Sequence, residues 1–178
     1  MKYIVIVSIF FSSFFLGAEE NKPKVSETIH IYLCSRLTEA AKQWNDEITQ
    51  EFDEEFDIFR PQDIDLSHYS LKEQDLFAYT EDLKGMKKSD LLLVLPPYGR
   101  DCGWEIGWFS GKGKPAIAYA ESQGDWQRDA MVKGGLIAII TNNEALYQSL
   151  LEDSSTKDKC HLISTRKLLP KAIKEIVK

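Results

Sequence analysis

Short, largely apolar runs recur along most of the chain, separated by segments with a different hydrophobic spacing. In the run at 91–95 (LLLVL) every position is apolar, which is typical of a parallel strand covered on both faces. Runs of similar character predict strands at 29–33, 56–59, 91–95, 115–119 and 136–140, with a short edge strand possible at 160–163. The pattern therefore predicts a sheet of mostly buried strands.

The segments between these runs carry apolar residues at helical spacing. In the segment 37–52, one side of a helix would present Ala41, Trp44, Ile48 and Phe52. Comparable patterns predict helices at 71–86, 104–109, 142–151 and 165–177. Residues 121–133 show no clear period, so we expect a loop there.

The alternation of strands and helices within one domain predicts an α/β fold with a doubly wound parallel sheet. We expect about five strands in the flavodoxin-like order 2-1-3-4-5, with helices on both faces. In that order the strands at 29–33 and 91–95 are neighbours. The loops that follow them then meet at the switch point of the sheet, where such folds bind ligands.

The N-terminal segment differs from the rest of the chain. A lysine and an apolar run at 3–16 precede two small residues and two glutamates. This arrangement is typical of a secretory signal peptide, because the run is short for a membrane span and small residues mark the cleavage site. We predict a signal peptide at 1–18, a polar leader at 19–28 and a single domain at 29–178. After cleavage the protein would be exported, either to the periplasm or to the medium, and would not be attached to the membrane. If the segment were not cleaved, it would anchor the protein to the membrane at the N-terminus.

Charge and motifs restrict the possible partners. The chain has 178 residues, a formal net charge of −6 and scattered lysines and arginines, whereas binding to nucleic acid requires a concentrated basic face. A small polar substrate fits this composition better. No G-x-G-x-x-G follows the first strand, and its exit loop CSRLT lacks a full phosphate cradle. We therefore predict neither a dinucleotide nor a flavin cofactor.

Cysteine usage gives no metal signature. Cys34, Cys102 and Cys160 form neither a C-x-x-C motif nor a pairing with suitably spaced histidines, so no zinc site is predicted. Cys34 and Cys102 both follow strands. They could form a disulfide in an oxidising compartment, or they could be two unrelated buried residues.

One acidic residue stands where the strand at 91–95 passes through a glycine-containing turn into a helix. This residue is Glu105, close to the predicted start of the helix, where the positive end of the helix dipole favours a carboxylate. We therefore expect Glu105 to be ionised. It can be a helix-capping acid, or a nucleophile or base in the ligand-binding crevice.

Several segments, in the same order along the chain, resemble the nucleoside 2-deoxyribosyltransferase family and the related deoxynucleoside monophosphate N-glycosidases. The similarity covers roughly residues 29–151. The matching segments are a tyrosine-bearing strand at 31–33, FRPQD at 59–63, Asp82 followed by Asp90, WEIG at 104–107 before GKP at 113–115, and MVKGG at 131–135.

The resemblance implies roles for individual residues. Glu105 would be the nucleophile, and Asp82 the acid that protonates the leaving base. Tyr32 would orient Glu105 through a hydrogen bond, and Gln62 would contact the nucleobase. Asp101 and Gly103, in the turn before Glu105, would also bind substrate, and Ser35, together with Arg36, could bind a phosphate on it.

Three functions follow from this interpretation. The first is transfer of 2-deoxyribose between nucleobases through a covalent glycosyl-Glu105 intermediate, since a carboxylate can stabilise and trap the positive charge that develops at C1′. The second is an N-glycosidase in which water is the acceptor. The third is a non-catalytic nucleoside-binding domain on the same scaffold. The resemblance implies a nucleoside or nucleotide and a free nucleobase as ligands, and a homo-oligomer in which a neighbour completes the pocket.

Overall fold

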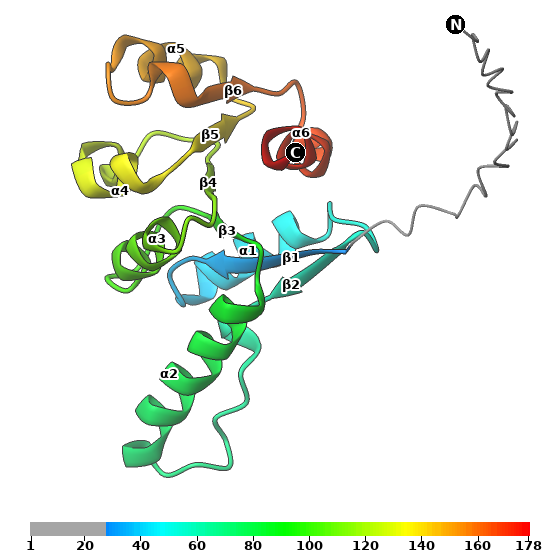
Figure 1. The fold of residues 1–178 in the computed structure, drawn as a ribbon, viewed down its shortest axis with the longest axis vertical. Helices are drawn as coiled ribbons and strands as arrows, with labels where there is room; N and C mark the ends of the chain where they lie inside the picture. Colours follow the sequence, from blue (N-terminus) through cyan, green and yellow to red (C-terminus); the bar gives the residue numbers. More distant parts are fainter. Residues whose placement is uncertain (1–27) are drawn as a thin grey trace, which may run out of the picture.

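The computed structural model describes residues 28–178 and contains one parallel sheet with helices on both sides (Figure 1). The predicted signal peptide and most of the polar leader lie outside the described residues. The sheet has six strands in the order β2-β1-β3-β4-β5-β6, and every neighbouring pair is parallel. The strands are β1 (Ile29–Cys34), β2 (Phe56–Phe59), β3 (Leu91–Val94), β4 (Ala116–Tyr119), β5 (Ala138–Thr141) and β6 (Cys160–Leu162). The α/β, flavodoxin-like prediction is confirmed, and the edge strand β6 raises the count from the expected five to six.

Six α-helices and four short 3₁₀ helices connect the described strands. The α-helices are α1 (Glu39–Thr49), α2 (Leu71–Lys88), α3 (Cys102–Gly111), α4 (Ala130–Gly135), α5 (Glu144–Glu152) and α6 (Leu169–Val177). The 3₁₀ helices span Pro61–Asp63, Asp125–Arg128, Lys157–Lys159 and Arg166–Leu168. Within residues 28–178, no helix combines the length and the apolar character needed to cross a membrane.

The sheet separates two hydrophobic cores. On one face, side chains from α2, α3, α4 and α5 pack on Tyr32, Cys34, Leu92 and Val94. On the other face, side chains from α1 and α6 pack on the alternate residues, including Ile31 and Leu33. Because both faces of the inner strands are covered, their sequences show no polar alternation.

The segment predicted as a loop at 121–133 contains the short helix Asp125–Arg128 and most of α4. The Asp129 side chain caps α4 by accepting hydrogen bonds from the backbone N–H groups of Met131 and Val132. A helix this short gives no repeating apolar pattern, and its final glycines suggest a break. A Cβ at Gly135 would lie 2.4 Å from Ile106 Cγ2, so this glycine allows α4 to approach α3 closely.

Strand order brings the exit loops of β1 and β3 together. The backbone N–H of Arg36 donates to the carbonyl oxygen of Pro97 at 3.0 Å, and that of Leu95 donates to the Cys34 carbonyl at 2.9 Å. The start of α3 follows directly after the β3 loop. The adjacency of the two loops at the switch point, which the strand order predicted, is therefore confirmed.

Candidate active site

Glu105 and Tyr32 form a hydrogen-bonded pair beneath the carboxyl ends of β1 and β3. The Tyr32 hydroxyl, on β1, donates to Glu105 Oε1 at 2.8 Å, and Glu105 lies in the first turn of α3. Tyr32 is fully buried and Glu105 is only 6% exposed. Tyr32 and Glu105 are far apart in sequence, and they meet where α3 packs against the sheet.

Aromatic neighbours fix the position of the Tyr32 ring. Phe59 of β2 stacks on it with ring centroids 5.4 Å apart and an interplanar angle of 15°. Phe109 of α3 lies on it at a centroid distance of 6.2 Å and a tilt of 45°. With the ring held in this way, the hydroxyl has a defined direction toward Glu105.

Burial dominates the electrostatics of Glu105. Desolvation raises its pKa to about 7, against the opposing effect of hydrogen bonds from Cys34 and Tyr32. The charges of Asp101 and Asp82 raise the pKa further. The sequence analysis considered only the helix terminus; burial and the neighbouring acids bring the pKa of Glu105 close to neutral pH, where both the carboxylate and its protonated form are present.

Asp82 of α2 is the second carboxyl group of this cluster. Burial raises its pKa to about 6, a hydrogen bond with Tyr32 acts in the opposite direction, and the charges of Asp101 and Glu81 add to the increase. Its Oδ1 is buried without a hydrogen-bond partner. Asp82 and Glu105 are thus two acids close to one phenol.

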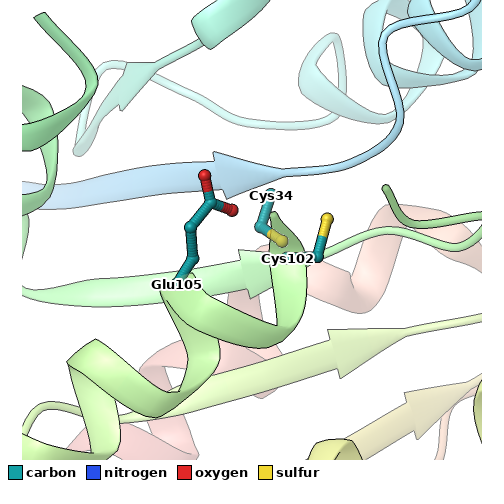
Figure 2. Close-up of side chains that lie close together, drawn as sticks. All are labelled: Cys34, Cys102 and Glu105. Carbon is teal, nitrogen blue, oxygen red and sulfur yellow. The ribbon is translucent and has the colours of Figure 1, made fainter. Parts of the chain in front are cut away.

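Two thiols complete the surroundings of Glu105. Cys34 from β1 and Cys102 from α3 lie beside Glu105, and their sulfur atoms and a carboxylate oxygen lie within 4.8 Å of one another (Figure 2). Both cysteines are buried and both are free thiols in this structure, not a disulfide. The sequence analysis placed each cysteine after a strand but did not place either beside Glu105.

A cavity of about 410 Å³ lies at the same end of the sheet, among the loops that follow β1, β3 and β4. Its lining includes Arg36, Tyr98, Trp126 and Asp129, and Glu105 is not among the lining residues. The Tyr98 hydroxyl and Trp126 Nε1 are buried without hydrogen-bond partners. Buried donors of this kind are usually satisfied by a bound molecule or water.

A sequence profile described as nucleoside 2-deoxyribosyltransferase matches residues 31–156, which is more than two thirds of the chain. The chain belongs to this family. No curated protein matches it.

Two solved structures illustrate the structural likeness. A 2-deoxyribosyltransferase from Bacillus psychrosaccharolyticus is 21% identical, over 62% of this chain and 84% of its own, with a TM-score of 0.47. A conserved protein from Enterococcus faecalis V583 is 24% identical, over 83% of this chain and 98% of its own, also with a TM-score of 0.47.

The structure gives Gln62, which the family resemblance assigned to the nucleobase, a different set of contacts. Its side-chain oxygen accepts from Asn45 Nδ2 at 2.8 Å, and its Nε2 donates to Asp46 Oδ1 at 3.0 Å. Both partners belong to α1. The amide is therefore occupied by α1 in this state, and its contact with a base stays a prediction.

The other three predicted substrate residues lie around the β1 and β3 loops. Ser35 is buried, and its Oγ has no hydrogen-bond partner. Asp101 is exposed at the start of α3, and its backbone oxygen accepts from the Glu105 N–H at 3.0 Å. A Cβ at Gly103 would meet open space. Their roles in substrate binding stay predictions.

Proposed function

We propose that this protein transfers 2-deoxyribose between nucleobases, with Glu105 as the nucleophile. The observation that carries the proposal is the buried hydrogen bond between Tyr32 and Glu105 at the switch point of a sheet from this enzyme family. A carboxylate held on one oxygen by a fixed phenol keeps its other oxygen available for attack at an anomeric carbon.

In the first half-reaction, a Glu105 oxygen forms a bond to C1′ while the bond between C1′ and the base nitrogen breaks. The electron pair of that bond goes to the base, which takes a proton from Asp82. The products are a glycosyl ester on Glu105 and a free, neutral base. Positive charge on the sugar is greatest in the transition state between the bound nucleoside and the glycosyl ester, and the carboxylate stabilises it there.

In the second half-reaction, a nitrogen of the incoming base attacks C1′ and the glycosyl ester bond breaks. Glu105 recovers its carboxylate, and Asp82 takes back the proton that the new base loses. The same two carboxyl groups therefore act in both directions, as microscopic reversibility requires. The configuration at C1′ is retained.

Replacement of the nucleophile tests this proposal. We expect Glu105→Gln to reduce base exchange between a deoxynucleoside and a different free base by roughly 10³-fold or more, because a nucleophile is lost. The matched control is Glu152→Gln, at an exposed glutamate in α5, which should retain the wild-type rate. Chromatography of the two bases and two nucleosides measures the rate, and wild-type exchange by Glu105→Gln would refute the proposal.

A second candidate function is hydrolysis of a nucleotide, with water as acceptor. Ser35 Oγ is buried without a partner and Arg36 lines the cavity of about 410 Å³, so these residues favour a substrate with a phosphate group. Base release from a deoxynucleoside and from its 5′-monophosphate, each with and without acceptor base, separates the two reactions. Binding without turnover in all four assays would favour a non-catalytic nucleoside-binding domain.

We also propose that the protein is a homo-oligomer in which a second copy covers α2 and α3. Leu76, Tyr79 and Trp104 are 70%, 53% and 51% exposed, and the Tyr79 and Trp104 rings lie 6.3 Å apart. Exposed apolar side chains grouped in this way are typical of association surfaces. Leu76→Glu should lower the mass measured by sedimentation, whereas Glu152→Gln should leave it unchanged.

We propose, finally, that residues 1–18 direct export and are removed. The mass of the protein recovered outside the cytoplasm should correspond to a chain that begins at Glu19. An Ala18→Arg variant should keep its N-terminal segment, because a small residue is needed at the cleavage site. Recovery of full-length wild-type protein from the cytoplasm alone would exclude this route.

A further inference from the structure

The cluster around Glu105 contains more chemistry than sugar transfer uses. Two thiols and one carboxylate converge there, with one donor atom from each within 4.8 Å of the others (Figure 2). Cys34 and Cys102 are fully or almost fully buried, and Glu105 is 6% exposed. Neither thiol takes part in the proposed transfer reaction.

We propose that Cys34, Cys102 and Glu105 bind a thiophilic divalent cation such as Zn²⁺. Sulfur and carboxylate are ligands that Zn²⁺ prefers, at about 2.3 Å and about 2.0–2.2 Å, so tetrahedral donors lie roughly 3–4 Å apart. The three donor atoms are already within 4.8 Å of one another, so binding a cation requires only that they move closer together. Each thiol releases one proton to solvent as it binds the cation.

Neighbouring groups support this ligand set. The Gly99 backbone N–H donates to Cys102 Sγ at 3.3 Å, which holds this sulfur in place at the start of α3. The Tyr32 hydroxyl fixes one Glu105 oxygen, as a second layer of hydrogen bonds does around many metal ligands. With three protein ligands, a tetrahedral cation keeps one position open for water.

The spacing of the cysteines did not predict this site, because the donors come from two distant segments that strand order brings together. The consequence for activity rests on the proposed function. A cation bound to Glu105 occupies the carboxylate that would attack C1′. Bound Zn²⁺ therefore inhibits transfer, and a chelator restores it.

The experiment is a titration of the metal-free mature protein with Co²⁺ under a reductant that does not bind metal. We expect one ion per chain and the near-ultraviolet charge-transfer absorbance of thiolate-bound Co²⁺. Cys34→Ser and Cys102→Ser should each weaken binding at least about tenfold and reduce that absorbance, because each removes a ligand. Cys160→Ser is the matched control, because Cys160 lies on β6 outside the cluster.

Folding of each variant is checked by circular dichroism, and Glu105→Gln gives a third ligand variant that leaves both thiols in place. Absence of thiolate absorbance in the wild type, or equal affinity in the wild type, Cys34→Ser and Cys102→Ser, would overturn the metal site. If the metal-free protein exchanges bases but gives no thiolate–Co²⁺ spectrum, the metal site is refuted and the transferase proposal stands. If the protein gives that spectrum but exchanges no bases, the transferase proposal is refuted and the metal site stands.

Discussion

Tyr32 acts through two separate parts of one side chain. Its ring packs against Phe59 and Phe109, and its hydroxyl donates to Glu105. The ring contacts belong to the core, whereas the hydroxyl belongs to the candidate site. A substitution that removes only the hydroxyl therefore keeps the packing of the ring and tests the effect of the hydrogen bond to Glu105 alone.

We expect Tyr32→Phe to lower kcat for base exchange by roughly 10–100-fold with little change in KM, because loss of one hydrogen bond to a charged group costs about 1.5–3 kcal/mol. Steady-state kinetics measure both constants. Tyr147→Phe on α5 is the control and should be unaffected. A change in KM alone would show that Tyr32 contacts substrate and does not position Glu105.

Asp82 allows a different kind of test, based on the leaving group. Asp82→Asn should slow transfer from ordinary deoxynucleosides by about 10²–10⁴-fold, the usual effect of losing a general acid. Substrates whose base leaves readily without protonation should lose much less activity. Rates for a series of leaving bases measure this difference, and an equal loss across the series would assign Asp82 a structural role.

At this scale, the family resemblance named Tyr32, Asp82 and Glu105, and the structure places these three residues near one another. Their roles stay predictions. The raised pKa of Glu105 was not predicted, because it depends on burial and on Asp101 and Asp82. The thiols beside it depend on strand order, which a motif does not contain.

At the scale of elements, α2 reaches the site only because it crosses β2 closely. A Cβ at Gly85 of α2 would lie 2.6 Å from the Phe59 ring, which in turn stacks on Tyr32. Gly85 thus sets the spacing between helix and strand. Asp82 lies one turn earlier on the same helix, so this crossing also places the second carboxyl group.

Gly85→Ala should lower the free energy of unfolding by about 1–3 kcal/mol, because the ring of Phe59 must move. It should also slow base exchange through the displaced Tyr32. Urea unfolding and kinetics measure the two effects. Gly107→Ala on α3 is the matched control: its Cβ meets open space, so helix propensity should make it neutral or stabilising by up to about 1 kcal/mol. Equal stability of both variants would exclude the steric argument.

The sequence predicted the elements that have a continuous or repeating apolar pattern and missed α4, which has none. Continuous apolar runs gave the strands, because burial on both faces determines their composition. The helix α4 was missed, since it is a single capped segment whose position depends on Asp129 and on contact between Gly135 and Ile106. Contacts between elements, rather than local pattern, determine that helix.

At the scale of the whole molecule, Arg166 connects three distant parts of the chain. Its Nε and Nη2 donate to the two oxygens of Glu121, after β4, at 2.9 and 3.0 Å. Its guanidinium lies over the Trp44 ring of α1, 4.7 Å from the centroid. Burial opposes ionisation of Glu121, but hydrogen bonds from Arg166 and Tyr119 outweigh it and lower its pKa.

Arg166→Ala should reduce the free energy of unfolding at pH 7 by about 1–3 kcal/mol. Because the pKa of Glu121 is lowered in the folded state, its contribution is present above the unfolded pKa and is lost as pH falls through the folded pKa. The difference between wild type and variant should therefore shrink in acid. Urea unfolding across that range measures it, with Lys171→Ala, at an exposed pair with Glu175, as a near-neutral control. A constant difference would mean that Arg166 acts through packing on Trp44.

The separation of the two cores by the sheet restricts how β1 can change length. Alternate residues of this strand serve opposite cores, so Tyr32 faces α3 while Ile31 and Leu33 face α1 and α6. A deletion of one residue ahead of Tyr32 would shift the register and turn the phenol toward the wrong core. A substitution within β1 therefore preserves this alternation, whereas an insertion or deletion of one residue inside the strand reverses it.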